Sequence, residues 1–167
     1  TQSRSSAASD VYKRQVLMAA SASKEVVLPA QPAPLHGTLL APEGETAAVA
    51  VILPGSGPTD RDGNSPLGVR AATYRLLAEG LAEGGIATVR IDKRGIGASA
   101  AAGGSEADLR FGDYVADARA WTSEAVRRTG KPCAWLIGHS EGALIATLAA
   151  ENNPEVCGLV LLSGACL

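Results

Sequence analysis

Residues 138–142 read Gly-His-Ser-Glu-Gly, a pattern that can present a serine for nucleophilic attack. The pattern stands between an apolar run typical of a buried strand, residues 134–137, and an Ala- and Leu-rich run typical of a helix, residues 142–151. A serine on so sharp a turn has a strained backbone, and the residues two before and two after it approach their neighbours closely. Glycine fits both places because it has no side chain, so we interpret Gly138 and Gly142 as the glycines of the turn and Ser140 as a candidate nucleophile.

Two backbone N–H groups are predicted to stabilise the negative charge that such an attack develops. The helix after the serine directs its N-terminal amides at that charge, which makes the N–H of Glu141 one candidate donor. The second candidate is the N–H of Ser56, in a glycine-rich loop that follows the first continuous apolar run. His139 is adjacent to the serine, but neighbours on such a turn point apart, so we expect it to pack or hydrogen-bond locally and not to act as general base. We expect His36 to be structural or exposed.

The loop at residues 53–64 has other possible functions, and its sequence disfavours each of them. A phosphate loop would need Gly-Lys-Ser/Thr after the glycines, and a dinucleotide fingerprint would need glycine where Asp60 stands. A calcium loop could begin at Asp60, but Ser65 replaces its required glycine and Ala71 its terminal glutamate. We therefore expect no metal ion and no organic cofactor, and we expect the charged residues 60–62 to brace the loop by hydrogen bonds and ion pairs.

The segments that must position these groups alternate between strand and helix. The patterns predict strands at residues 25–28, 35–41, 47–53, 86–91, 134–137 and 156–162, and helices at residues 69–83, 111–129 and 142–151. The first two strands are expected to pair as a hairpin, and residues 95–104 to form a loop. This order predicts the α/β class, a mostly parallel sheet with helices on both faces.

Composition narrows the class of protein further. The chain has 167 residues, enough for one domain, and its net charge of −2 comes without a basic stripe that would favour nucleic acid. No apolar run approaches the about 18 residues that a membrane span requires. The three cysteines, Cys133, Cys157 and Cys166, show no metal-like spacing, and we interpret them as reduced core thiols, with a disulfide or a reactive thiol as the alternative.

Residues 1–23 do not fit the downstream pattern and are interpreted as a disordered or non-native leader. The end of this segment, residues 13–23, could be the tail of a secretory signal, because an apolar stretch with small residues follows Lys13 and Arg14. A cytoplasmic location is expected, with an exported or periplasmic one as the alternative. The sequence leaves the oligomeric state open.

Three motifs in this order resemble the α/β-hydrolase superfamily, in a bacterial serine esterase branch near the serine aminopeptidase (S33) and dienelactone hydrolase groups. Residues 138–142 look like the nucleophile elbow of that superfamily, and residues 54–57 resemble its His-Gly oxyanion segment, with Pro54 where many members have His. Residues 92–99, Asp-Lys-Arg-Gly-Ile-Gly-Ala-Ser, are similar to its Asp-x-Arg-Gly-x-Gly-x-Ser turn. The resemblance covers residues 24–167.

The resemblance implies hydrolysis of a small-molecule carboxylic ester through an acyl-enzyme on Ser140, with the N–H groups of Ser56 and Glu141 holding the oxyanion. It also implies a catalytic His and an acid that follow the nucleophile, yet no His follows Ser140 in this sequence. We therefore expect residues 24–167 to be the N-terminal part of one α/β-hydrolase domain, truncated after about the sixth strand, inactive alone and with a bare apolar edge at residues 159–162. A peptidase, a thioesterase and a non-catalytic binding protein of the same fold stay open as alternatives.

Overall fold

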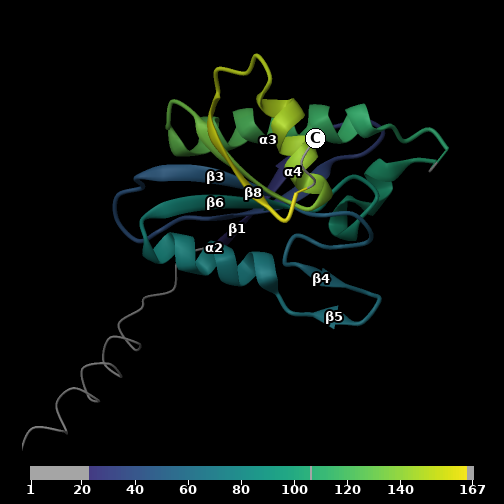
Figure 1. Ribbon diagram of the computed structural model, residues 1–167, viewed down its shortest axis with the longest axis horizontal. Helices are drawn as coiled ribbons and strands as arrows, with labels where there is room; N and C mark the ends of the chain where they lie inside the picture. The colour runs from purple at the N-terminus through teal and green to yellow at the C-terminus, as the bar shows by residue number, and fades with distance from the viewer. Residues whose placement is uncertain (1–22, 106, 165–167) are drawn as a thin grey trace, which may run out of the picture.

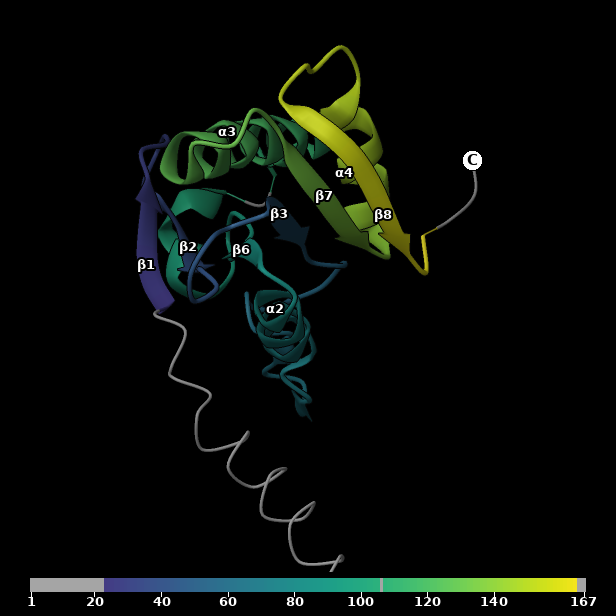
Figure 2. The same ribbon diagram turned by 90° about the vertical axis from the view of Figure 1, so that its left-hand side faces the viewer.

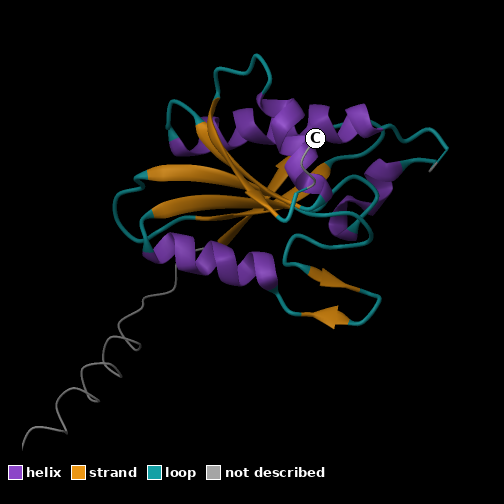
Figure 3. Cartoon of the chain, viewed as in Figure 1, coloured by secondary structure: helices purple, strands orange, loops and turns teal. Residues whose placement is uncertain are grey.

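The computed structural model describes residues 23–105 and 107–164, which form a sheet with helices on both faces (Figure 1). The strands of the main sheet are β1 (Ser23–Leu28), β2 (Leu35–Leu40), β3 (Ala48–Leu53), β6 (Ile86–Ile91), β7 (Ala134–His139) and β8 (Val156–Leu162). The helices are α2 (Thr73–Glu83), α3 (Phe111–Thr129) and α4 (Glu141–Ala150), with a 3-10 helix, η1 (Gly97–Gly103), and a two-stranded ribbon of β4 (Asn64–Ser65) and β5 (Val69–Arg70). Helix α2 covers one face of the sheet, and α3 and α4 cover the other (Figures 1 and 3).

The strand order is β1-β2-β6-β3-β7-β8, and the pairing confirms a mostly parallel sheet. Strands β1 and β2 form the predicted antiparallel hairpin, and β2 is antiparallel to β6. The remaining pairs, β6 with β3, β3 with β7, and β7 with β8, are parallel. Because helices follow β3, β6 and β7 and return the chain to the same end of the sheet, the carboxyl ends of these strands meet at one edge.

Strand β3 lies at the centre and divides its side chains between two core layers, as alternate residues of a strand must. Val51 faces α3 and α4 and packs with Trp121 and Leu136, which are fully buried. Ile52 faces α2 and packs with Tyr74 and other residues of the second layer. The continuous apolar run at β3 is therefore a strand buried on both faces.

Helix α2 begins at Thr73, four residues later than the apolar spacing predicts. Val69 is half-exposed and belongs to the β4–β5 ribbon, so it contributes nothing to the apolar face of the helix. The first N–H groups of the helix are bonded to the preceding loop: the carbonyl oxygen of Asp62 accepts hydrogen bonds from the N–H groups of Tyr74 and Arg75. The side-chain oxygen of Asn64 accepts one from Ala72, whose φ of 49° is not helical. Local turn chemistry thus outweighs the hydrophobic period here.

Cys133 and Cys157 form a disulfide with a Cα–Cα distance of 5.3 Å, so their interpretation as reduced core thiols is wrong. Cys157 is exposed and Cys133 is half-buried. The two residues meet because Ala134 and Val156 are register partners at the start of the adjacent strands β7 and β8. This adjacency follows from strand order and register, which cysteine spacing does not reveal. Cys166 lies outside the described residues.

Strand β8 lies at the edge of the described sheet opposite β1 (Figure 2). Its last three residues, Val160, Leu161 and Leu162, are 40%, 50% and 38% exposed, and Trp135 on the neighbouring strand is 41% exposed. These exposures confirm the apolar edge for three of the four residues expected there; Leu159 is partly buried against the core. Among residues 23–105 and 107–164, no helix has both the length and the apolar character to cross a bilayer.

Backbone segments lie close together where β7 turns into α4. A Cβ placed on Gly138 would lie 2.3 Å from the carbonyl oxygen of Gly142, and one placed on Gly142 would lie 2.3 Å from that of Leu53. Both obstacles are backbone atoms, which cannot rotate away as a side chain could. The absence of a side chain at these two positions is therefore a steric requirement of the turn.

We predict that Gly142→Ala lowers the free energy of unfolding by at least about 2 kcal/mol, because the added methyl group overlaps the backbone of β3. Gly80→Ala is the matched control, since Gly80 is an exposed residue inside α2 with nothing within 4 Å of the added Cβ. This control is expected to raise stability by about 0.5–1 kcal/mol. Urea denaturation measures both values, and equal stabilities of the two variants would contradict the steric account.

Candidate active site

Ser140 lies at the carboxyl end of β7 and immediately precedes α4, with φ 53° and ψ −117°. This is a strained conformation for a residue with a side chain, as expected for a serine presented on a sharp turn. Its N–H donates a hydrogen bond of 2.9 Å to the carbonyl oxygen of Leu162, which ties the turn to the end of β8. Its carbonyl oxygen accepts from Ala143 at 3.0 Å and closes the first turn of the helix.

The glycine-rich loop after β3 passes directly against this serine. A Cβ placed on Gly55 would lie 3.2 Å from the Cβ of Ser140, so the backbone of the loop comes as close as a glycine allows. Ser56, the next residue, lines the same cavity as Ser140. Glu141 is the first residue of α4, where an N–H has no acceptor within the helix. The structure thus brings Ser56 to the start of α4, where Ser140 and Glu141 lie, although the two segments are far apart in sequence.

A cavity of about 290 Å³ opens beside Ser140. Its wall is a mixture of apolar side chains, hydroxyl groups and the imidazole of His139, and none of the described residues in it is Asp, Glu, Lys or Arg. The side chains that form it are Ser56, Thr59, Ser65, Val69, Thr73, Tyr74, Leu77, His139, Ser140 and Leu162. A cavity of this size and character suits part of a small, uncharged organic molecule.

His139 is hydrogen-bonded locally, as expected. Its Nδ1 lies 2.8 Å from the hydroxyl oxygen of Tyr74, and that hydroxyl oxygen accepts the N–H of Gly55 at 3.1 Å. Burial raises the pKa of Tyr74, although the N–H of Gly55 acts in the opposite direction. The hydroxyl therefore keeps its proton at neutral pH, and its contact with Nδ1 holds the imidazole of His139 to Tyr74.

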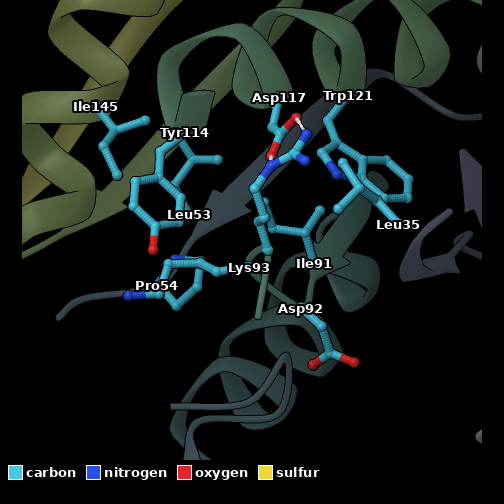
Figure 4. A pocket seen from close by; sticks show the side chains of 11 residues that line it. Leu35, Leu53, Pro54, Ile91, Asp92, Lys93, Tyr114, Asp117, Trp121 and Ile145 are labelled. Atoms are coloured by element: carbon cyan, nitrogen blue, oxygen red, sulfur yellow. Dashed lines mark hydrogen bonds and ion pairs between the residues drawn. The ribbon is translucent and has the colours of Figure 1, made fainter. Parts of the chain in front are cut away.

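Lys93 contacts both the loop after β3 and the first residue of α4. Its Nζ donates to the carbonyl oxygen of Gly55 at 2.6 Å and lies 3.3 Å from Oε2 of Glu141. It also lies 5.7 Å from the centre of the Tyr114 ring. Figure 4 shows Lys93 beside Pro54 and Tyr114 in the narrow pocket under the loop. No sequence pattern points to a role for Lys93 or Tyr74, because only the fold brings them to the backbone groups that they contact.

A buried carboxylate, Asp92, fastens the neighbouring loops together. It accepts hydrogen bonds from the backbone N–H and Nε of Arg61, at 2.8 and 2.9 Å, and from the N–H of Ala98 at 3.0 Å. Asp62 pairs with Arg90, and Oδ1 of Asp60 accepts from two N–H groups of its own loop. The prediction that residues 60–62 brace the loop is confirmed. In the described part of the chain, no three His, Cys, Asp or Glu residues are grouped to hold a metal ion.

Neither histidine of the sequence is placed as a base for Ser140. His36 is on β2, where its Nδ1 lies 3.1 Å from Oε1 of Glu25. Nδ1 of His139 is hydrogen-bonded to the hydroxyl of Tyr74. Within residues 23–105 and 107–164 no hydrogen bond of the Ser140 hydroxyl is present. What the site offers chemically is a strained serine, two backbone N–H groups near it and a partly apolar cavity.

Several solved structures with the same fold are hydrolases by their names. A dienelactone hydrolase from Anabaena variabilis superposes with a TM-score of 0.67 at 24% identity, over 86% of this chain and 63% of that one. A carboxyl esterase from Bacillus coagulans superposes with a TM-score of 0.65 at 19% identity, over 85% of this chain and 44% of the esterase. An α/β serine hydrolase without a lid from Xanthomonas campestris superposes with a TM-score of 0.62 at 27% identity, over 86% of this chain and 62% of that one. The chain thus spans less than two thirds of each of these proteins.

No curated protein sequence matches this chain. A family model described as serine aminopeptidase, S33, matches residues 67–167, which is more than half of the chain and includes the Ser140 turn and Lys93. By this match and by its fold, the chain belongs to the serine aminopeptidase S33 family of α/β-hydrolases.

Proposed function

We propose that this protein is a serine hydrolase that cleaves small carboxylic esters through an acyl-enzyme on Ser140. One observation carries the proposal: Ser140 holds a strained conformation at the start of α4, on a cavity that the Ser56 loop also lines. Strain of this kind costs about 1–3 kcal/mol and persists where function requires it. A protein that only bound small molecules would have no need for a strained serine, which disfavours the non-catalytic alternative.

In the proposed reaction, Oγ of Ser140 attacks the ester carbonyl and a tetrahedral intermediate forms. The N–H groups of Ser56 and Glu141 bind the oxyanion, and the N-terminus of α4 adds a favourable dipole. A histidine oriented by a carboxylate takes the serine proton and gives it to the leaving alcohol, after which water releases the acid. In the described part of the chain, His36 and His139 are hydrogen-bonded to Glu25 and Tyr74 and are not assigned this role.

The cavity favours an ester over a peptide substrate. An aminopeptidase must hold the positively charged amine at the start of its substrate, and a carboxylate is the usual partner for such a group. None of the described residues that line the cavity is Asp or Glu. The names of two related structures, a dienelactone hydrolase and a carboxyl esterase, are consistent with an ester substrate. A thioester has the same shape and stays as the second candidate.

We predict that a fluorophosphonate probe labels Ser140, because an activated serine attacks the probe's phosphorus as it would attack a carbonyl. The experiment uses the gene product encoded through its natural stop codon, and mass spectrometry of the peptides locates the label. Ser140→Ala should abolish the labelling, whereas Ser123→Ala, which alters an exposed serine on α3, should retain it. A folded protein without label on Ser140 would remove the basis of the proposal.

The bond that is cleaved is assigned with three substrates that share one acyl group: an oxygen ester, a thioester and an anilide. The expected order of kcat/KM places the oxygen ester first. If the protein is labelled on Ser140 but prefers the thioester or the anilide, the assignment as a serine hydrolase stands and the assignment of an ester substrate is wrong.

We also propose that the protein works in an oxidising compartment, as an exported or periplasmic protein does. The support is the Cys133–Cys157 disulfide, since disulfides persist in such compartments and are rare in the cytosol.

In protein isolated from its own cells, both cysteines should resist thiol reagents until a reductant is added. The bridge closes a sequence separation of 24 residues, so Cys133→Ser with Cys157→Ser should lower the free energy of unfolding by about 3 kcal/mol. A reductant should destabilise the parent and leave the double variant unchanged. Free thiols at both positions in the isolated protein would contradict the proposal.

A further inference from the structure

Lys93 is almost fully buried, with 7% of its surface exposed, and three groups surround its ammonium. They are the carbonyl oxygen of Gly55, the carboxylate of Glu141 and the ring of Tyr114. Burying a charge is costly unless it is paired and hydrogen-bonded, and an apolar side chain would fill the same space without that cost. A buried lysine at this position therefore calls for an explanation other than packing.

The contact with Gly55 fixes one peptide plane. The carbonyl of Gly55 and the N–H of Ser56 belong to the same peptide bond, which is trans, so the two groups point in opposite directions. Holding the carbonyl oxygen at 2.6 Å from Nζ thus sets the direction of the Ser56 N–H. The preceding peptide is held separately, because the N–H of Gly55 donates to the buried hydroxyl of Tyr74.

Gly55 and Ser56, the two residues that share this peptide, line the cavity beside Ser140, and Lys93 is not among the residues that line that cavity. Ser56 and Ser140 line the cavity of about 290 Å³, whereas Lys93 and Glu141 line a separate one of about 410 Å³. A carbonyl drawn toward Lys93 leaves the N–H of Ser56 directed to the side of Ser140. In the described part of the chain that N–H has no acceptor, so it is available to a substrate.

The same ammonium also contacts the residue that supplies the other donor. Nζ lies 3.3 Å from Oε2 of Glu141, whose backbone N–H is the first of α4. One buried cation therefore connects the loop after β3 with the start of the helix after β7. Since Glu141 is about one third exposed, water can solvate its carboxylate if Lys93 is removed.

We propose that Lys93 is a positioning residue of the oxyanion hole: by holding the carbonyl oxygen of Gly55, it directs the N–H of Ser56 at the oxyanion formed on Ser140. Lys93 touches no substrate in this arrangement and acts only through the peptide that it orients. The inference rests on the proposed function and adds the group that organises its site.

The test compares kcat and KM of the full gene product with those of Lys93→Met, using the oxygen ester described above. An oxyanion donor acts on the transition state and not on substrate binding, so kcat should fall on the order of 100-fold while KM changes less than about threefold. The rate of fluorophosphonate labelling should fall in parallel. Lys93→Leu is a second apolar variant with the same expectation, and the Tm of each variant reports whether it is folded.

Two further variants separate positioning from stability. Asp117→Asn weakens the neighbouring buried ion pair, in which Arg94 lies 2.7 Å from Asp117, without contacting Gly55. It should lower Tm and leave kcat unchanged. Glu141→Gln removes the ion pair of Lys93 but leaves the contact with Gly55, so its loss of kcat should be at least tenfold smaller than that of Lys93→Met.

A folded Lys93 variant with the kcat of the parent would overturn this inference and leave the proposed function standing, provided that the parent is labelled on Ser140. A loss of kcat in Glu141→Gln equal to that in Lys93→Met would also overturn it, because the ion pair and not the carbonyl contact would then be responsible. A parent without labelling or ester turnover would overturn both proposals together.

Discussion

Ser140 can keep its strained backbone because the first turn of α4 lies against the end of β3 with no side chain between them. The carbonyl oxygen of Leu53 lies where a Cβ of Gly142 would have to be, and the carbonyl oxygen of Gly142 lies where a Cβ of Gly138 would have to be. This contact sets the height of α4 over the sheet, the direction in which its N-terminus points and the distance of Ser140 from the loop that follows β3. The rest of the candidate site is arranged around it.

Hydrogen bonds to loop backbone then supply the order that glycine-rich segments lack. The N–H of Gly55 donates to Tyr74, and its carbonyl oxygen accepts from Lys93. The carboxylate of Asp92 accepts from the N–H groups of Arg61 and Ala98 and so connects the two loops that contain them. Tyr74 comes from α2, whereas Asp92 and Lys93 directly follow β6, so the site becomes ordered only when the sheet and α2 are assembled. Glycine gives the loop its close approach to Ser140, and the buried polar side chains remove the flexibility that glycine brings.

Sequence alone predicts the strands, the sheet class and the turn at Ser140, because apolar periodicity and glycine spacing are local signals. It misplaces the start of α2, since the turn at residues 60–64 captures the first N–H groups of the helix and leaves Val69 outside it. It also misjudges Cys133 and Cys157, which are brought together by the register of β7 on β8. Lys93 and Tyr74 escape it for the same reason: their partners are backbone atoms 38 and 19 residues away.

The central claim is that two backbone N–H groups and Ser140 form one catalytic unit. A crystal structure of the full gene product after reaction with a small phosphonate tests it most directly, because the adduct carries an oxygen where the oxyanion would be. The account predicts phosphorus bonded to Oγ of Ser140 and that oxygen within about 3 Å of the N–H groups of both Ser56 and Glu141. An adduct whose oxygen points away from either N–H, or contacts only water, would contradict the account.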